Sequence, residues 1–369
     1  MIPSAPLLRR RQLLQLGLGA SALFTLPSGL TGCRAEKAHQ LLLVGGELPL
    51  AWLRELPSPW RGRPLADAAS LLKQLQAPQP ASAAIGLVSL TDGWATSLPV
   101  SRWQPLQAPA PLERLAEWAR PISRLFGPPE GPELAFPWAF SPWVLVLRNR
   151  PSLAARAAEG WDLLLDPSLR GKLVLPSSPR LCIELMGRDF DRIQALRRQA
   201  LAYDDRDGLN LLLSGEAEAA VAPLRRLIPL LRRDQRLQVV LPDSGAPLSW
   251  QLLLRPTGTA LLPPADWLTA ALEPPLLAAL LGAGWVPPLP RAVLESEVRR
   301  FPASLAPLLL PGQEVLERCW SLPPLTTPQR LALQTVWDAS GLPAASAPEA
   351  PARRGGQAAV GVGQQLGDR

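Results

Sequence analysis

The sequence predicts an α/β fold of two domains, and three observations lead to this prediction. The chain has 369 residues, more than the roughly 100–200 residues of one ordinary domain. Apolar residues make up 47% of the chain, so a large core can be buried. Short apolar runs alternate with segments of helical spacing, an order typical of a parallel sheet that helices cover on both faces.

The first strands place two candidate binding residues. Residues 40–45 form an apolar run bounded by glycines, residues 65–75 have helical spacing, and residues 82–90 form a second apolar run. The second run ends in a polar turn that contains Asp92 and precedes Trp94. Because ligands of such sheets bind at the carboxyl ends of strands, Asp92 and Trp94 are candidates for ligand contact.

The remaining elements follow in the same alternating order. A proline-rich stretch at 126–137 leads into a strand at 138–148, which is rich in β-formers. Further strands are expected at 173–176, 219–223, 237–242 and 250–255, and helices at 179–187, 190–202, 209–215 and 266–281. Glycines and prolines after residue 281 stop the last helix. From residue 343 the chain is rich in Ala, Pro, Gly and Arg and has almost no bulky apolar residues, which predicts a disordered tail.

The net charge of +7 does not indicate a nucleic-acid partner. Arg9, Arg10 and Arg11 lie in a segment that we expect to be removed. The other arginines are scattered among acidic residues, without the basic stripe interleaved with aromatics that nucleic-acid binding requires. We therefore expect no nucleic acid among the partners.

Histidine and cysteine are too few for most catalytic or metal sites. The one histidine, His39, is expected on the surface, and the cysteines are Cys33, Cys182 and Cys319. Imidazole-based nucleophilic catalysis needs a positioned histidine, and zinc needs several His or Cys ligands, so the sequence predicts no metal and no cofactor. A Cys182–Cys319 disulfide stays open. Carboxylate catalysis also stays open, because it needs only two acids.

The N-terminus has the layout of an export signal. Residues 9–33 read RRRQLLQLGLGASALFTLPSGLTGC, a positive cluster followed by an apolar run shorter than the ~20 residues that span a bilayer. The pair Arg10-Arg11 with the following residues resembles a twin-arginine signal, and residues 30–33 resemble a lipobox. Residues 1–32 are then the signal, and Cys33 carries lipid that holds the protein in the membrane as a periplasmic lipoprotein. The alternative is an anchor helix with an incidental cysteine.

Five short motifs resemble those of one family in the same order. They are DGW at 92–94, FPW at 136–138, WDLLLDP at 161–167 with RGKLVLP at 170–176, GEAEAA at 215–220, and the LP to Trp spacing of 241–250. Together they resemble the spermidine/putrescine-type extracellular solute-binding proteins of ABC transporters. The resemblance covers roughly residues 41–290.

The resemblance implies a two-lobed, type II periplasmic-binding-protein fold of the Venus-flytrap kind, in which the chain crosses twice between the lobes. Residues 33–140 with 252–305 then form lobe 1, and residues 141–251 form lobe 2. Residues 306–342 form a C-terminal helical extension and 343–369 the tail. The implied partners are a small solute in the cleft and the permease and ATPase of an importer, and we expect a monomer.

The ligand is where this chain departs from the family. A polyamine carries ammonium groups, and burying them requires carboxylates. The family's acid positions hold Ser178, Leu181 and Leu252 here, and Arg180 adds the opposite charge. Asp92 and Glu184 are the nearest remaining acids. Arg180 and the amides of a helix start suit an anionic or zwitterionic solute instead.

Six tryptophans divide into two groups. Trp94, Trp138 and Trp250 are either cleft walls that stack on a ligand or parts of the core, and both readings stay open. Core positions are expected for Trp267, Trp285 and Trp337, which lie on helical or proline-flanked segments. The ligand-binding set predicted from the sequence is therefore Asp92, Trp94, Trp138, Ser178, Arg180, Glu184 and Trp250.

Three functions are compatible with these features. The first is a lipid-anchored solute-binding component of an importer, which is not an enzyme. The second is a sensory or scaffolding lipoprotein on the same fold, without a transporter. The third is an exported hydrolase, which needs two acids facing each other about 5–10 Å apart. Asp204 and Asp205 are expected in a solvated turn rather than in such a pair.

Overall fold

The structure is a computed structural model that describes residues 38–77 and 84–341. The predictions for the export signal, for Cys33 and for the tail at 343–369 lie outside these residues. Among the helices of the described part, none is both long enough and apolar enough to cross a bilayer.

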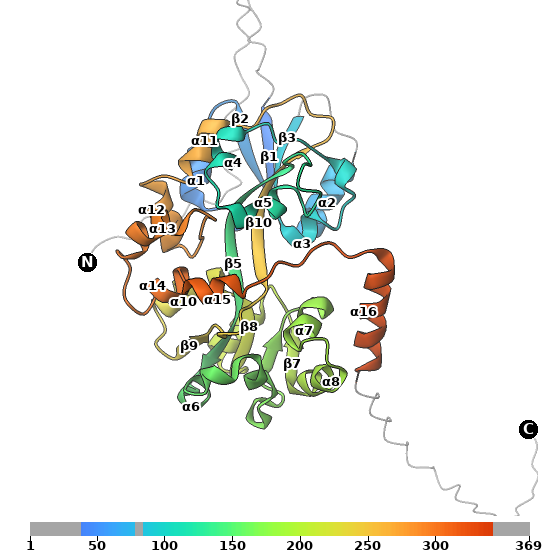
Figure 1. Cartoon of the computed structure of the whole chain (residues 1–369), viewed down its shortest axis with the longest axis vertical. Helices are drawn as coiled ribbons and strands as arrows, with labels where there is room; N and C mark the ends of the chain where they lie inside the picture. Colours follow the sequence, from blue (N-terminus) through green and yellow to red (C-terminus); the bar gives the residue numbers. More distant parts are fainter. Residues whose placement is uncertain (1–37, 78–83, 342–369) are drawn as a thin grey trace, which may run out of the picture. The chain divides into compact units, whose positions relative to one another are not determined.

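The strands of the described part form one mixed ten-stranded sheet (Figure 1). Its order is β2-β1-β3-β10-β5-β8-β6-β7, with β4 paired to β10 and β9 paired to β5. The strands are β1 (His39–Val44), β2 (Trp60–Leu65), β3 (Ala84–Thr91), β4 (Trp103–Gln104), β5 (Ala135–Arg148), β6 (Leu173–Leu175), β7 (Ala200–Tyr203), β8 (Ala219–Pro223), β9 (Leu237–Val240) and β10 (Leu248–Pro256).

Two long antiparallel strands connect the two halves of this sheet. β10 pairs with β5 from Leu248↔Pro142 to Leu254↔Ala135, and the far part of β5 pairs with β8 and β9. We call the part around β2-β1-β3 lobe 1 and the part around β8-β6-β7 lobe 2. The chain therefore crosses between the lobes twice, along β5 and along β10. The lobe boundaries proposed from the sequence, at 140/141 and 251/252, fall inside these two strands.

The expected parallel sheet is found within each lobe but not at the crossings. β1 is parallel to β2 and to β3, and β6 is parallel to β7 and to β8. β10 is antiparallel to both β3 and β5. The reason is topological: one crossing strand carries the chain into lobe 2 and the other returns it, so the two must run in opposite directions.

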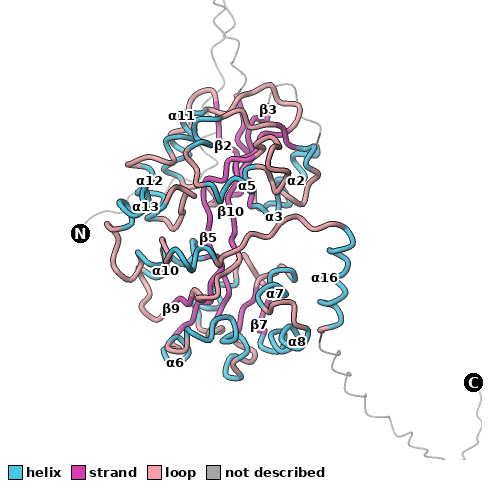
Figure 2. The backbone as a smooth tube through the Cα atoms, in the orientation of Figure 1, coloured by secondary structure: helices cyan, strands magenta, loops and turns pink. Residues whose placement is uncertain are grey.

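Helices lie outside the strands of both lobes, as Figure 2 shows. Lobe 1 carries α1 (Leu50–Arg54), α2 (Ala68–Gln76), α3 (Asp92–Ala95), α4 (Pro109–Glu113), α5 (Arg120–Ser123), α11 (Ala265–Ala270), α12 (Leu276–Gly282) and α13 (Arg291–Val298). Lobe 2 carries α6 (Pro151–Ala154), α7 (Pro179–Leu185), α8 (Phe190–Gln199), α9 (Gly208–Ser214) and α10 (Leu224–Leu231). The C-terminal extension holds α14 (Ala306–Leu309), α15 (Gln313–Glu317) and α16 (Thr327–Ala339).

Three elements differ from the sequence-based expectation. The helix expected at 266–281 is two helices, α11 and α12, because Pro274 and Pro275 cannot continue a helix interior. β2 was not predicted, since it contains Gly62 and Pro64; as an edge strand paired only with β1, it tolerates both. The helix expected at 190–202 ends at Gln199, and the chain continues as β7.

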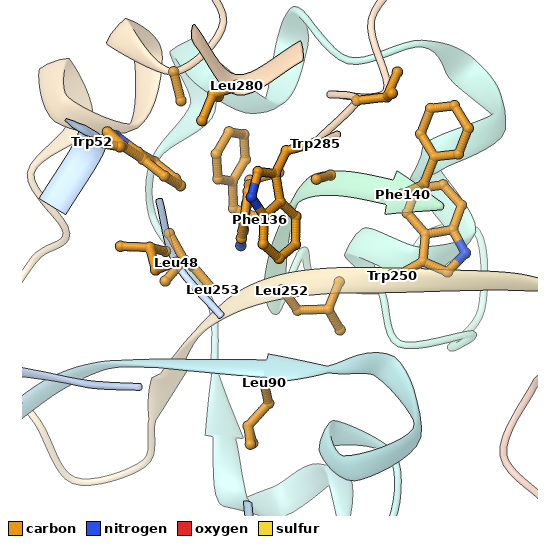
Figure 3. Packing of buried hydrophobic residues seen from close by; sticks show 14 of the residues in the cluster. Leu48, Trp52, Leu90, Phe136, Phe140, Trp250, Leu252, Leu253, Leu280 and Trp285 are labelled. Atoms are coloured by element: carbon orange, nitrogen blue, oxygen red, sulfur yellow. The ribbon is translucent and has the colours of Figure 1, made fainter. Parts of the chain in front are cut away.

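Tryptophans such as Trp52 and Trp285 are part of the lobe 1 core (Figure 3). Trp52 and Trp267 stack with their ring centroids 4.3 Å apart, and each indole N–H donates to the other residue's carbonyl oxygen at 2.9 Å. Trp285 is buried beside Trp138. The core positions predicted for Trp267 and Trp285 are confirmed.

Two other expectations about aromatic residues were wrong. Trp337 is only half-buried, and the guanidinium of Arg197 lies 4.2 Å from its ring centroid. Trp337 therefore packs on the outside of lobe 2 rather than in a core. His39 belongs to β1 and is half-buried, with its ring edge-on to Trp60 at 5.3 Å.

Candidate functional site

A cavity of about 450 Å³ lies where the two lobes face each other. Lobe 1 contributes the end of β3 and α3, lobe 2 contributes the start of α7, and the crossing strands contribute the floor. We call it the inter-lobe pocket. Its lining residues are Thr91, Asp92, Gly93, Trp94, Thr96, Ser97, Trp143, Ser177, Ser178, Arg180, Leu181, Asp205, Leu248, Ser249, Leu322, Pro324, Leu325 and Arg330.

Asp92 begins α3 directly after β3 and is buried, with 7% of its surface exposed. Its Oδ1 accepts a hydrogen bond from the backbone N–H of Trp250 in β10 at 3.1 Å. Burial raises the pKa of Asp92 to about 6, and the hydrogen bonds from Trp250 and Gly93 and the charge of Arg180 oppose that rise. The carboxylate therefore links the end of β3 to a crossing strand at the pocket wall.

Trp94 offers an aromatic face to a solute. Its side chain is 44% exposed although it lines the pocket. The short helix that carries it is fixed by the hydroxyls of Thr96 and Ser97, which donate to the carbonyl oxygens of Asp92 (2.8 Å) and Trp94 (2.7 Å). An exposed indole held by a rigid turn can stack on a planar or apolar part of a ligand.

The start of α7 forms the opposite wall. Ser178 is the N-cap of this helix, and its hydroxyl oxygen accepts from the N–H of Leu181. The N–H of Ser177 donates to Asp205 at 3.2 Å, and the Ser177 hydroxyl also bonds to that carboxylate. Asp205 lies in an exposed bend, as expected from the sequence. It also lines the pocket, where its carboxylate accepts the hydrogen bonds from Ser177.

Arg180 is the cation of this wall. Within residues 38–77 and 84–341, no carboxylate lies within 4 Å of its guanidinium, and its buried Nε has no hydrogen-bond partner. Partial burial lowers the pKa of Arg180, while Glu184 and Asp92 raise it. Because the guanidinium of Arg180 has no carboxylate partner, its N–H groups can donate hydrogen bonds to a ligand.

Glu184 does not face the pocket, contrary to the sequence-based expectation. Its carboxylate pairs with Arg188 at 2.8 Å, one turn further along the same segment. On a helix, residues four apart lie on one side. The pairing with Arg188 therefore fixes Glu184 beside its own helix.

Trp138 and Trp250 are core residues, so the cleft-wall reading is wrong for both. Each is fully buried, with 0% of its surface exposed. Trp138 packs against Trp52 and Trp285, with ring centroids 5.2 and 4.8 Å away. Trp250 packs against Phe140, as Figure 3 shows. Neither residue lines the pocket, although their strand neighbours Trp143 and Ser249 do.

A larger cavity of about 540 Å³ lies elsewhere and is less suited to a charged solute. It is lined largely by lobe 1 and α15, including Trp118 and Leu316. Its charged residues have partners in the protein: Arg291 pairs with Glu295 at 2.9 Å, and Glu117 pairs with Arg120 at 3.0 Å. The inter-lobe pocket, which holds unpaired cations at the carboxyl end of β3, is the better candidate.

The described residues contain no group of three or more His, Cys, Asp or Glu side chains able to hold a metal ion. Cys182 and Cys319 are both free thiols. Burial raises the pKa of Cys182 to about 12, which keeps it a thiol at neutral pH. The pocket acids Asp92 and Asp205 are held by donors of the protein itself.

Most of the pocket lining could not be predicted from the sequence: of the predicted ligand-binding set, Asp92, Trp94, Ser178 and Arg180 line the pocket. It did not find Trp143 and Ser249 on the crossing strands, because no local pattern shows which strand positions face a cavity. It also missed Leu325 and Arg330, which come from the C-terminal extension. No local signal marks them, since the pocket residues of the two lobes lie far away in the chain, at Ser249 and before it.

Comparisons with known proteins agree on the fold. No family model and no curated protein sequence matches the chain. The spermidine/putrescine substrate-binding protein PotD of Streptococcus pneumoniae, solved with calcium and HEPES, is 11% identical with a TM-score of 0.61, over 83% of this chain and 98% of its own.

Two further structures agree over similar lengths. The TpPotD lipoprotein of Treponema pallidum is 12% identical with a TM-score of 0.56, over 82% of this chain and 99% of its own. The IdiA (FutA) protein of Trichodesmium, solved with iron and citrate, is 12% identical with a TM-score of 0.54, over 82% and 99%. Together with the two crossing strands, these comparisons show that the chain has the two-lobed α/β fold of the type II periplasmic binding proteins.

Proposed function

We propose that this chain is the extracytoplasmic solute-binding component of an ABC importer and captures a small polar solute in the inter-lobe pocket. The observation that carries the proposal is the pocket itself: about 450 Å³, lined by both lobes, with an exposed indole and unpaired guanidinium groups. The fold is shared with substrate-binding proteins such as PotD, which supports a role in binding rather than catalysis.

Capture follows from the topology. The two crossing strands β5 and β10 are the natural hinge, because they connect the sheets of the two lobes. Closing about this hinge would bring Trp94 of lobe 1 and Arg180 of lobe 2 onto the same solute and exclude water from it. The closed form is then the one that a permease recognises.

The solute is not a polyamine under this proposal. The nearby acids are already used: Asp92 by Trp250, Asp205 by Ser177, and Glu184 by Arg188. A buried ammonium without a carboxylate partner costs several kcal/mol, and ~1.4 kcal/mol is already tenfold in affinity. Calorimetry of the mature protein with spermidine should show no binding at micromolar concentrations. A micromolar dissociation constant would contradict this and would point to Asp92 as a polyamine ligand.

The importer role is tested by uptake. A solute that raises the melting temperature of the mature protein should no longer enter cells in which the gene is deleted. Restoring the gene should restore uptake, and the Arg180→Ala variant should not. Arg198→Ala is the matched control, because Arg198 is an exposed arginine of α8 outside the pocket. Unchanged uptake in the deletion strain would contradict the importer role and favour the transporter-independent lipoprotein.

Membrane attachment through Cys33 and export through Arg10-Arg11 belong to the same proposal. Several acyl chains on one cysteine give stable anchoring, so Cys33→Ser should move the protein from the membrane fraction to the soluble or unprocessed fraction. Lysines at positions 10 and 11 keep the charge but lack the guanidinium fork, so the double Arg→Lys variant should not be exported. A Cys33→Ser protein that stays in the membrane after leader removal, or normal export of the lysine variant, would contradict the respective part.

A further inference from the structure

The segment between α15 and α16 forms part of the lining of the inter-lobe pocket. We call residues 320–326 the strap; Figure 1 shows it running from α15 to α16. Its first residue is paired with the crossing strand: the N–H of Trp320 donates to the carbonyl oxygen of Ala246 at 3.1 Å, and the N–H of Leu248 donates to that of Trp320 at 2.8 Å. The strap thus begins as a short addition to β10.

Two residues, Trp250 and Gly245, contact the strap and the end of α15 that precedes it. The indole N–H of the buried Trp250 donates to the hydroxyl of Ser321 at 2.9 Å. Gly245 has a φ of 87°, and a Cβ at this position would lie 2.1 Å from the carbonyl oxygen of Arg318. Only glycine allows this backbone conformation and this close approach together. The seat of the strap is therefore specific.

The far end of the strap is fixed to lobe 2 through α16. The helix begins at a capping box formed by Thr326 and Gln329. Trp337 stacks on the guanidinium of Arg197 and meets the edge of Tyr203, with ring centroids 5.6 Å apart. The same arginine donates to the hydroxyl of Ser340 at 3.2 Å. The strap is therefore fixed at both ends. Its first residues bond to the crossing strand β10 and the residues just before it, and α16 at its far end packs on lobe 2.

The strap and α16 contribute a second cation to the pocket. Leu322, Pro324, Leu325 and Arg330 all line it. In the described part of the chain, Arg330 has no carboxylate within 4 Å, and its guanidinium makes one long hydrogen bond, 3.4 Å, to the carbonyl oxygen of Leu325. Arg180 is likewise without a carboxylate. The acids Asp92 and Asp205 already accept hydrogen bonds from the protein.

We propose that the strap is a fixed wall of the binding site and that Arg180 and Arg330 together clamp the carboxylate or phosphate group of an anionic solute. This inference rests on the proposed capture of a solute in the inter-lobe pocket and names the class of that solute. A guanidinium fork matches the oxygens of a carboxylate or phosphate in a bidentate way. Because α16 packs on α7 of lobe 2, closure of the lobes would bring Arg330 closer to Trp94 of lobe 1.

The test measures melting temperature and then calorimetric affinity on the mature protein. The acidic probes are citrate, succinate and inorganic phosphate; spermidine and maltose are the cationic and neutral comparators. The variants are Arg330→Ala, which keeps a good helix former in α16, and Trp337→Ala, which loosens the helix from Arg197. Arg233→Ala is the control, since Arg233 is exposed and lies outside the pocket.

At least one acidic probe should stabilise the protein, and Arg330→Ala should weaken its binding tenfold or more. Trp337→Ala should also weaken it, whereas Arg233→Ala should not. Equal affinity of the acid for the parent and for Arg330→Ala would overturn the proposal. Binding of maltose or spermidine without any acid would overturn it too, while leaving solute capture intact. Binding of none of the five probes would count against the anion clamp and against capture alike.

Discussion

Asp92 is the residue where the pocket and the hinge meet. Its carboxylate lies at the end of β3 and accepts the Trp250 N–H of β10. Desolvation favours the protonated form, which is why its pKa rises to about 6 from the ordinary 3.8. The folded state therefore retains a proton that the unfolded chain has lost between about pH 4 and pH 6.

This difference predicts the pH dependence of an Asp92→Asn variant. Ionised Asp92 costs stability above about pH 6. The cost fades as the pH falls through the ordinary pKa of 3.8, below which the carboxyl is protonated in both states. An amide keeps the acceptor for Trp250 without the charge. We expect the variant to be more stable than the parent by about 2–3 kcal/mol at pH 7.5 and equally stable near pH ~3.

Chemical denaturation of both proteins across this pH range measures the difference. Glu130→Gln is the control, because Glu130 is an exposed loop acid. An Asp92→Asn protein that is less stable than the parent at pH 7.5, or a difference that does not change with pH, would show that burial does not dominate at this carboxyl.

For single residues, the sequence predicted which ones lie at a strand end or helix start better than it predicted which way a strand side chain points. Asp92 and Trp94 line the pocket because a strand end is visible in the sequence, and Ser178 and Arg180 line it because a helix start is visible. Their role in binding remains a prediction. Trp250 could not be placed, since a strand buried on both faces shows no alternation between core and cavity.

Among the elements, α1 and α11 are joined by the paired tryptophans Trp52 and Trp267. The two indoles stack, and each donates to the other's backbone. Trp267→Phe keeps an aromatic ring but leaves the buried carbonyl of Trp52 without its donor. We expect a loss of about 1–3 kcal/mol in the free energy of unfolding.

Thermal and urea unfolding would measure this loss. Trp118→Phe is the matched control, because Trp118 is 38% exposed and meets the ring of Phe140 edge-on, without the reciprocal hydrogen bonds. Equal stability of the two variants would mean that the stacking area, and not the hydrogen bonds, holds α1 to α11.

The residue composition of each segment explains which helices and strands could be predicted from the sequence. Continuous apolar runs such as β8 were predicted to the residue, whereas β2, with Gly62 and Pro64, carries breaker residues that only an edge position tolerates. The strap could not be predicted at all. Its position depends on Gly245 and Trp250, which are distant in the sequence and show no pairing signal there.

At the scale of the whole molecule, the proposed capture of a solute depends on relative movement of the lobes. Lobe 1 carries Trp94, lobe 2 carries Arg180, and α16, which packs on lobe 2, carries Arg330. The hinge is the pair of strands β5 and β10. Binding that uses both sets of residues should favour the closed arrangement, because only that arrangement places all of them on one solute.

The most direct test is a distance measured between the lobes with paired spin labels. Labels at Lys73→Cys in α2 and Asp191→Cys in α8, both exposed, report across the pocket once the three native cysteines are replaced. Labels at Lys73→Cys and Val293→Cys stay within lobe 1 and serve as control. With the solute that stabilises the protein most, the inter-lobe distance should shorten and narrow while the control distance stays constant. An unchanged inter-lobe distance at saturating solute would contradict capture by closure.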